Sequence, residues 1–487
     1  MSQELYSRSE CSLLIRRAQL LGRGVFDVRI SGSTITALAE QLVPLSGESI
    51  VEAGCNLLLP GLHDHHLHLF ATAAARASVV CGPPQVNNEV ELEAALLKHC
   101  KSKSTWLRGV GFHDSVSKRI DRQWLDRVCG NRPVRIQHRS GMMWILNSCA
   151  LSELAIDEKI ELPDGAERGD DGQLSGRFYN LDAWLGERLA KVRPNLRDLS
   201  HELAAFGVTG LTDTGATNGR ASWSALEAAM NAGELRQRLL VMGNEELHEL
   251  VATQPKRMAL GPLKIYLREV TLPELDALVA RIATAHQHGR SAAFHCVSLV
   301  ELHFAILALR EAGVRAGDRI EHAAIADDYA LDALAELGIT VVTQPHFIAE
   351  RGDQYLVDVD VDDVPLLYRG ASFLRAGVAL AAGSDAPYGG TDPWSSMRAA
   401  IARRTPSDVE IGRKETLSPL QALNLFGGEL QKPGGDLRAL AVGQVADLCL
   451  LALPWEQLQL DLDARHVALT LCDGQIIYDA AATQLAS

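Results

Sequence analysis

Long apolar runs and paired cysteines are both missing from this chain of 487 residues. No apolar stretch approaches the roughly 18 residues that a membrane-spanning helix needs, which excludes a helical integral membrane protein. The 9 cysteines are odd in number, scattered along the chain and never spaced as Cys-x-x-Cys. This distribution excludes a disulfide framework and favours reduced thiols in the cytoplasm.

Positive charge is scarce as well. Lys and Arg number 47 against 61 Asp and Glu, and the formal net charge at pH 7 is −14. Such a charge disfavours binding to nucleic acid or to an anionic membrane surface, so we expect neither as a partner. Residues 1–10 are polar and contain no signal-peptide core, which agrees with a cytoplasmic location.

Both ends of the chain contain short patterns that are typical of β-strands. They lie at 25–30, 33–38, 445–451 and 467–472. Asp473-Gly474 then predicts a tight turn into a final strand. Because neither end alone has enough apolar surface for an independent domain, we expect residues 1–56 and 428–487 to form one small composite β-sandwich.

The centre of the chain alternates β-rich and helical patterns, which predicts parallel βαβ units. Helical patterns include 272–288, 299–312 and 328–337. Eight strands are expected, at 57–62, 208–212, 239–243, 263–267, 292–295, 319–322, 339–344 and 378–382. These predict an α/β fold, a (β/α)8 TIM barrel built from residues 57–74 and 197–427. The gap after the first strand is too long for one crossover, so residues 75–196 are expected to form an inserted subdomain.

The most informative motif is the run LLLPGLHDHHLHL at residues 57–69. Alternate side chains of a strand point to the same face, so His66 and His68 can converge on one point, as imidazole ligands of a divalent metal do. His63 and His65 have the opposite parity, and we expect them to pack behind the ligands. Taken alone the pair is weak evidence, because a chance cluster of histidines at a strand end looks the same.

Four further residues at or near the ends of predicted barrel strands strengthen the metal hypothesis. They are Lys264, His295, His322 and Asp385. The intervals from Lys264 to His295 and from His295 to His322 are 31 and 27 residues, close to the roughly 30 residues of one βα unit. Since barrel active sites assemble at the carboxyl ends of the strands, we expect these side chains to meet there.

Two of these residues have more than one interpretation. Lys264 lies in an apolar strand, so its amine is either neutral, paired or modified, or else it reaches solvent. Asp385 follows Gly383-Ser384 and is either a turn residue or a carboxylate that takes a proton from a metal-bound water.

These residues resemble the pattern of the amidohydrolase superfamily. That pattern is Pro-Gly-x-x-Asp-x-His-x-His on the first strand, a lysine on the fourth, histidines on the fifth and sixth, and an aspartate on the eighth. The first element is matched by Pro60, Gly61, Asp64, His66 and His68. The phrases VGQVADL at 442–448 and CDG at 472–474 are also similar to that superfamily. The most similar branch is the one that contains N-substituted formamide deformylase, through SG at 140–141 and QPH at 344–346.

The resemblance implies a hydrolase that uses zinc or a similar ion to cleave an amide-type C–N bond in a small-molecule substrate. The implied metal ligands, for one or two ions, are His66, His68, Lys264, His295, His322 and Asp385. The metal would lower the pKa of a bound water towards about 7, and Asp385 would carry the proton to the leaving amine. His322 is either a ligand or a contact for the oxyanion, and Lys264 is either carboxylated, bridging two ions, or unmodified.

Other functions stay open at this stage. A deaminase of this superfamily usually has a glutamate soon after the fifth-strand histidine, whereas here Cys296-Val297-Ser298 follow His295 and Glu301 lies further along. This disfavours deamination of an aromatic base. A lactonase or esterase would use the same centre. A non-catalytic scaffold would have lost ligands that this chain retains.

Candidate substrate contacts are His346, past the seventh strand, and His113 and Arg139 in the insertion. For His113 the alternative is an ordinary loop residue, and for Arg139 it is a structural ion pair. The chain departs from the most similar branch at Met142 and at 266–269, where it reads YLRE, so the substrate is not carried over. The number of metals and any homo-oligomer are also left open.

Overall fold

The computed structural model describes residues 12–83, 85–100, 106–118, 120–157, 162–169, 171–189, 193–252 and 255–486. Residues 1–10, on which the expected cytoplasmic location depends, lie outside this part. The chain divides into two compact units, one formed by Met1–Leu69 with Leu196–Ser487 and the other by Phe70–Asn195. Residue 75, where the insertion was expected to begin, lies inside helix α1 (Leu69–Arg76).

The first unit contains a sheet of eight parallel strands, which confirms the predicted barrel class. Its order is β19-β18-β17-β16-β15-β14-β13-β6. The strands are β6 (Leu62–Leu67), β13 (Val208–Asp213), β14 (Arg238–Gly243), β15 (Met258–Tyr266), β16 (Ala292–Cys296), β17 (Arg319–His322), β18 (Thr340–Thr343) and β19 (Leu380–Ala382). The chain beyond β19 also bonds to the end of β6, because the amide of Asp385 donates to the carbonyl of His66 at 2.7 Å.

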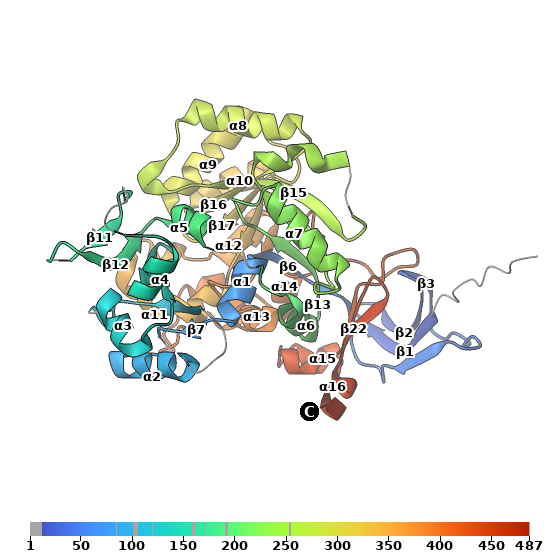
Figure 1. The fold of residues 1–487 in the computed structure, drawn as a ribbon. Helices are drawn as coiled ribbons and strands as arrows, with labels where there is room; N and C mark the ends of the chain where they lie inside the picture. The colour runs from blue at the N-terminus through green and yellow to red at the C-terminus, as the bar shows by residue number, and fades with distance from the viewer. Residues whose placement is uncertain are drawn as a thin grey trace, which may run out of the picture. The chain divides into compact units, whose positions relative to one another are not determined.

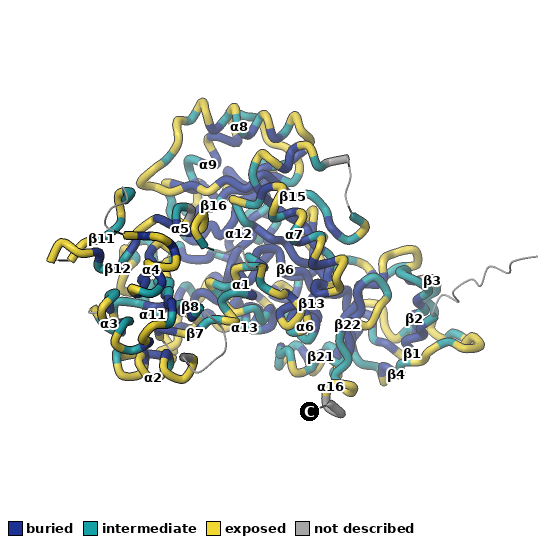
Figure 2. The backbone as a smooth tube through the Cα atoms, in the orientation of Figure 1, coloured by how far each residue is buried: buried dark blue, intermediate teal, exposed yellow. Residues whose placement is uncertain are grey.

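Helices alternate with these strands and cover them, as Figure 1 shows for α7, α8, α9 and α12 around β15 to β17. The helices are α6 (Arg197–Ala205), α7 (Arg220–Asn231), α8 (Leu275–Gln287), α9 (Leu299–Ala312), α10 (Asp328–Leu337), α11 (His346–Asp358), α12 (Gly370–Ala376), α13 (Pro393–Ala402) and α14 (Pro419–Asn424). Figure 2 shows the strands as buried and the outer faces of the helices as exposed. This agrees with the nearly continuous apolar runs of the strands, which a parallel sheet covered on both faces requires.

Local signals set the ends of these helices. Helix α10 begins after Asp327, whose side chain accepts from the amide of Ala330, and ends at Gly338, whose φ is 65°. Helix α9 begins with a reciprocal capping box between Ser298 and Glu301. Such caps satisfy the free amides of the first turn, and glycine takes the left-handed conformation at the end without strain. The predicted helices at 299–312 and 328–337 are α9 and α10.

The first predicted strand, 57–62, differs from what was expected. It divides at Gly61 into β5 (Leu58–Pro60), which belongs to another sheet, and β6, which belongs to the barrel. A Cβ on Gly61 would lie 2.2 Å from side-chain atoms of Thr209. Only glycine fits where the chain passes this close to β13, so the continuous apolar run serves two sheets.

Two four-stranded sheets combine the chain ends. One has the order β3-β2-β1-β4 and the other β22-β21-β20-β5. The strands are β1 (Ser12–Leu20), β2 (Gly24–Ser31), β3 (Thr34–Ala39), β4 (Ser49–Glu52), β20 (Leu448–Leu451), β21 (Val467–Cys472) and β22 (Gln475–Asp479). Buried residues of both ends, among them Ile15, Val28, Leu448 and Leu471, share one apolar core. Figure 1 shows β1 and β2 beside β22 accordingly.

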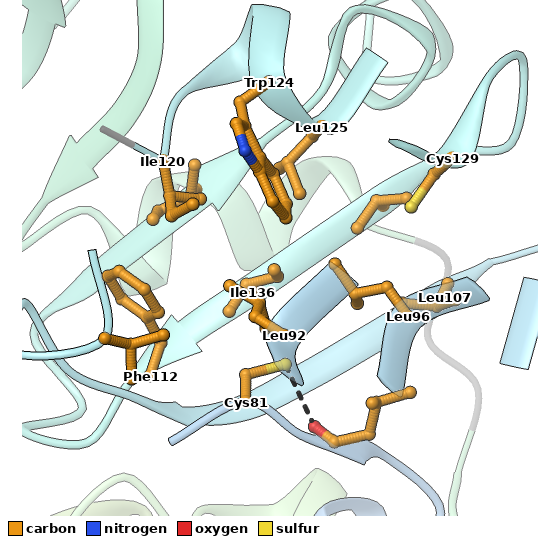
Figure 3. Close-up of a cluster of buried hydrophobic side chains, with 14 of the residues drawn as sticks. Cys81, Leu92, Leu96, Leu107, Phe112, Ile120, Trp124, Leu125, Cys129 and Ile136 are labelled. Atoms are coloured by element: carbon orange, nitrogen blue, oxygen red, sulfur yellow. Dashed lines mark hydrogen bonds between the residues drawn. The ribbon is translucent and has the colours of Figure 1, made fainter. Parts of the chain in front are cut away.

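The second unit has a six-stranded mixed sheet in the order β11-β12-β10-β9-β8-β7. Its strands are β7 (Val79–Val80), β8 (Leu107–Phe112), β9 (Val134–His138), β10 (Met143–Leu146), β11 (Ala166–Arg168) and β12 (Leu174–Tyr179). Its helices are α2 (Glu89–Cys100), α3 (Arg122–Cys129), α4 (Ser148–Glu153) and α5 (Asp182–Arg188). Leu92, Leu96, Trp124 and Leu125 of the helices pack around Ile136 of β9 (Figure 3), which gives this unit its own core.

The remaining elements are short. They are η1 (Glu245–Ala252), η2 (Glu269–Thr271), η3 (Val364–Leu366), η4 (Arg413–Glu415), α15 (Trp455–Leu458), η5 (Ala464–His466) and α16 (Ala480–Ala486). Among the residues that the structure describes, no helix combines the length and the apolar character that crossing a membrane demands.

Candidate metal centre

His66 and His68 converge on Asp385. His66 lies on β6 and His68 directly after it, whereas Asp385 lies beyond the end of β19. Oδ1 of Asp385 is 3.3 Å from Nε2 of His66 and 3.4 Å from Nε2 of His68. Two imidazole nitrogens and one carboxylate oxygen therefore face a common point at the carboxyl ends of the strands, as the alternation of a strand predicts.

His322 completes the tightest group. One ligand atom from each of His66, His322 and Asp385 lies within 4.8 Å of the other two, and all three residues are buried. The ring centroids of His66 and His322 are 4.8 Å apart. His295 continues this cluster, because its ring centroid is 4.5 Å from that of His322. The structure thus brings together His66, His68, His295, His322 and Asp385.

A left-handed backbone places His322. Its φ is 70°, and that of Asp385 is 50°. Non-glycine residues adopt this conformation at some cost, and such residues are concentrated at functional sites. At the end of β17 the turn breaks the alternation of the strand, so that both Glu321 and His322 can contact His66.

Side-chain acceptors fix the proton of two imidazoles. Nδ1 of His66 contacts Oε2 of Glu321, and Nδ1 of His322 lies 2.7 Å from Oε1 of Gln344. A carboxylate or an amide oxygen at Nδ1 requires the proton there, which leaves the lone pair on Nε2. Metal-ligating histidines are usually held in this way.

Glu321 and Arg319 lie behind the centre, and neither was a predicted site residue. Glu321 is fully buried, and Nε of the buried Arg319 donates to its Oε1 at 2.5 Å. The same guanidinium donates through Nη2 to the carbonyl of His65 at 2.9 Å. The sequence shows two opposite charges two residues apart in a strand that reads RIEH, which places both on the same face. This spacing suggests the Arg319–Glu321 pair but not the contact of Glu321 with His66.

Lys264 lies on β15 and is buried, with 3% of its surface exposed. Its Nζ makes no hydrogen bond in the described part of the chain. Burial lowers the pKa of this amine to about 8, although Glu321 acts in the opposite direction. An unpartnered buried amine is costly, so a chemical partner of Nζ that the protein itself does not supply would be favourable at this position.

The charge states follow from burial and neighbours. Burial lowers the pKa of His322 to about 4 and that of His295 well below its usual value, so both rings are neutral. Burial would raise the pKa of the Asp385 carboxyl, but His66 and His68 hold it well below its ordinary range. Burial and Lys264 act to lower the pKa of His66, yet Glu321 and Asp385 raise it overall. The site therefore favours a positive charge between His66 and Asp385.

Tyr266 stacks on the ring of His295. The two ring centroids are 4.0 Å apart with an interplanar angle of 20°, and Tyr266 is 51% exposed. The register pairs Tyr266 of β15 with His295 of β16. Arg268, in the segment where the chain reads YLRE, lies 5.1 Å from the centroid of the Tyr266 ring.

His346 lies at the start of α11 and is buried. Its Nε2 lies 3.0 Å from the carbonyl oxygen of Ser384, and its Nδ1 lies 3.1 Å from Oγ of Ser396. Both ring nitrogens therefore have protein partners, and the ring holds the backbone directly before Asp385. A contact between His346 and substrate stays a prediction.

His63 and His65 are buried packing histidines. Nδ1 of His63 accepts from Nη1 of Arg438 at 2.9 Å, whereas neither ring nitrogen of His65 has a hydrogen-bond partner among the described residues. Burial lowers the pKa of both rings well below the usual value, so both are neutral.

His113 and Arg139 belong to the second unit. Nδ1 of His113 bonds to Oγ of Ser115 at 2.8 Å, and its ring lies 5.6 Å from that of His138. Arg139 is exposed at the end of β9. Their expected contacts with substrate stay predictions.

Comparisons with known proteins agree with this geometry. The model of the amidohydrolase family matches residues 50–478. N-substituted formamide deformylase of Arthrobacter pascens is 24% identical over 496 residues, which cover 90% of each chain. An uncharacterized metal-dependent hydrolase from Pyrococcus furiosus superposes with a TM-score of 0.71 at 20% identity, over 90% of this chain and 98% of that chain.

A more distant solved structure contains a metal. Atrazine chlorohydrolase TrzN from Arthrobacter aurescens, complexed with zinc and atraton, has a TM-score of 0.56 and 14% identity and covers 96% of this chain and 95% of that chain. At these identities the solved structures establish the fold that they share with this chain.

Proposed function

This chain belongs to the amidohydrolase family, and from that premise we propose that it is a zinc-dependent hydrolase that cleaves an amide-type C–N bond in a small molecule. The observation that carries the proposal is the arrangement of His66, His322 and Asp385, whose ligand atoms lie within 4.8 Å of one another. Glu321 and Gln344 hold the two imidazoles with Nε2 available.

The donor set fits a divalent cation of intermediate softness. Imidazole nitrogens with one carboxylate, in a buried site, are ligands that zinc prefers, and an open position would remain for substrate or water. Would-be ligands are His66, His68, His295, His322 and Asp385, and Lys264 would join them if its unpartnered Nζ carries a carboxylate. When bound, zinc polarises a carbonyl and lowers the pKa of a coordinated water.

The protein's own groups account for the proton transfers. Asp385 is ionised and contacts both His66 and His68, so its carboxylate can accept a proton from the attacking water and deliver it to the departing amine. The neutral His322 is placed to contact the developing oxyanion or to act as a ligand. Glu321 and Arg319 keep the ring of His66 oriented throughout.

The structure gives less support to a deaminase. Glu301, the acidic residue that follows the fifth-strand histidine in the sequence, accepts from the amides of Val297, Ser298 and Glu269 at 2.7, 3.2 and 3.0 Å. A carboxylate held by three backbone amides at a helix start is occupied as a cap and is poorly placed to move a proton on a substrate ring. Hydrolysis of a lactone or ester on the same centre remains the second candidate, since the same attack cleaves C–O bonds.

The proposal is tested by metal analysis together with a substrate panel. We expect the purified protein to contain zinc in stoichiometric amount, to lose activity when a chelator removes it, and to regain activity with zinc. The panel compares an N-substituted formamide, a longer N-acyl amine, a lactone and an amino-substituted heterocycle. Activity in the metal-free protein would contradict the zinc dependence, and turnover of the lactone or heterocycle alone would contradict an amide hydrolase. Absence of both metal and turnover would support a non-catalytic scaffold.

A further inference from the structure

A cavity lies away from the metal centre. It has a volume of about 410 Å³, and its walls include His63 of β6, Arg238 of β14 and Met258 of β15. These residues are at or near the amino ends of their strands, whereas the metal centre is at the carboxyl ends. The segments 429–431 and 438–440, together with Gln444, Val445 and Asp447, also line it. The cavity therefore lies between the amino ends of the barrel strands and the chain that leads into β20.

The walls carry more positive than negative charge. Arg238, Lys256, Arg257 and Arg438 line the cavity together with two acidic residues, Glu429 and Asp447. This excess is a local reversal in a chain whose formal net charge is −14. Arg238 is balanced, because its Nε and Nη2 bond to Asp447 and Asp473 at 2.5 and 2.7 Å. Lys256 lies 3.4 Å from Asp473.

The other two arginines have no carboxylate partner among the described residues. Arg257 is half-buried, and its guanidinium makes one hydrogen bond, from Nη1 to the carbonyl of Arg236. Arg438 donates to the carbonyls of Gly61, Gly427 and Gly428 and to Nδ1 of His63. Neutral acceptors orient the guanidinium of Arg438, and Glu429 and Asp447 act on its charge without an ion-pair contact. A guanidinium that no carboxylate contacts favours binding of an anion.

We propose that this cavity binds a small oxyanion, a phosphate or a carboxylate, through the guanidinium of Arg257 beside the fixed charge of Arg438. A guanidinium presents a planar fork of N–H donors that matches both anions. The apolar walls formed by Leu239, Met258 and Leu440 would contact the remainder of the molecule. A volume of this size accommodates a phosphate or a carboxylate that belongs to a small organic molecule.

Titration calorimetry tests this inference by measuring the binding of inorganic phosphate to the zinc-loaded protein. Ionic strength is kept constant with sodium chloride, because general screening would otherwise imitate a specific effect. We expect saturable binding in the natural protein and at least tenfold weaker binding in Arg257→Gln. Arg310→Gln is the matched control, since Arg310 pairs with Glu336 on the surface of the barrel helices. Its affinity should be unchanged.

Phosphate could also bind at the metal, so the titration is repeated in Asp385→Asn. The proposal requires that binding persists there and that Arg257→Lys, which keeps the charge, retains more affinity than Arg257→Gln. Succinate in place of phosphate distinguishes a carboxylate from a phosphate ligand, and saturable binding of either supports the class. The proposal is overturned if neither anion binds, if Arg257→Gln binds as well as Arg310→Gln, or if Asp385→Asn abolishes binding.

Discussion

Buried charged residues at the two ends of the barrel differ in the hydrogen bonds that they make. At the carboxyl ends, His66 contacts Asp385, and the buried Nζ of Lys264 has no hydrogen-bond partner in the described chain. At the amino ends, Arg438 donates through Nη1 and Nη2 to backbone carbonyls and to one ring nitrogen. The first arrangement leaves atoms available for chemistry, whereas the second joins chain segments that are distant in sequence.

The histidines of β6 show the same contrast within one strand. His66 and His68 reach the carboxyl-end cluster, and His63 contacts Arg438 at the base. All three residues are histidines, so their residue type does not explain the difference. The face of the strand on which each side chain lies, and its position along the strand, determine whether it reaches the metal centre or the amino end. The comparison therefore predicts that substitutions at the carboxyl ends change activity, and that substitutions at the base change stability.

The largest effect is expected for Asp385→Asn. The amide cannot accept the proton from water and carries no charge for the metal, so we expect kcat to fall by roughly 10³-fold or more. Measured kcat against the best substrate of the panel checks this. Asp332→Asn on the exposed side of α10 is the matched control and should keep full activity. A fall of less than tenfold in Asp385→Asn would remove this residue from the proton path.

Arg438→Ala should destabilise the protein by about 3 kcal/mol, because several buried carbonyls at the base lose their donor. The measurement is the free energy of unfolding in urea at pH 7, with Arg310→Ala as the control for an exposed arginine. Zinc affinity of the folded variant should stay within about twofold. A loss of less than about 0.5 kcal/mol in the free energy of unfolding would show that the amino end of the barrel does not depend on this guanidinium.

Much of the carboxyl-end cluster could be predicted because its members are strand-end residues in a fixed order. Alternation placed His66 and His68 on one face, and the spacing of βα units placed Lys264, His295 and His322 on successive strands. The role of Glu321 could not be predicted, because Glu321 and His322 are adjacent and alternation assigns them to opposite faces. The left-handed φ of 70° at His322 depends on the tertiary structure, and no local sequence pattern predicts it.

The first barrel strand was misplaced for a similar reason. The run at 57–62 is apolar throughout, and periodicity cannot separate two consecutive strands that belong to different sheets. Contact with Thr209 at Gly61 makes the division, and Thr209 is about 150 residues away in the sequence. The charge of the cavity at the amino ends likewise depends on Arg238 and Arg257 together with Arg438, which lies far along the chain, so it could not be predicted from one segment.

Glu321→Gln tests whether a residue that contacts a metal ligand, and is not a ligand itself, also determines zinc affinity. The amide is a weaker acceptor for Nδ1 of His66 and no longer balances Arg319, so zinc affinity should fall by about 10- to 100-fold. Competition with a chromogenic chelator measures this. High zinc should restore most of the kcat, which a general folding defect would not allow. Glu336→Gln, an exposed surface pair with Arg310, is the control.

The smallest predicted effect is a change in the free energy of unfolding when Glu48 of the sandwich is replaced. We expect the charge of this residue to contribute to stability and not to activity. Its carboxylate accepts from Nε of Arg29 at 2.7 Å and from Oγ of Ser12 at 2.6 Å, and its side chain is 0% exposed. The bond from Arg29 lowers the pKa of this carboxyl to about 2. A carboxyl whose pKa is lower in the folded state contributes stability above its unfolded value of about 4.5, and loses that contribution as the pH falls towards 2.

Glu48→Gln should therefore lower the free energy of unfolding by about 1.5 kcal/mol at pH 7, and this deficit should shrink as the pH falls from about 4.5 to 2. Urea unfolding of the natural protein and of Glu48→Gln across this pH range measures the difference in the free energy of unfolding. The contributions of the other carboxylates are the same in both proteins and cancel in this difference. Glu52→Gln, which removes a largely exposed partner of Arg16, should show a much smaller and nearly pH-independent change. A constant deficit for Glu48→Gln would mean that the shape of the side chain, and not its ionisation, stabilises the sandwich.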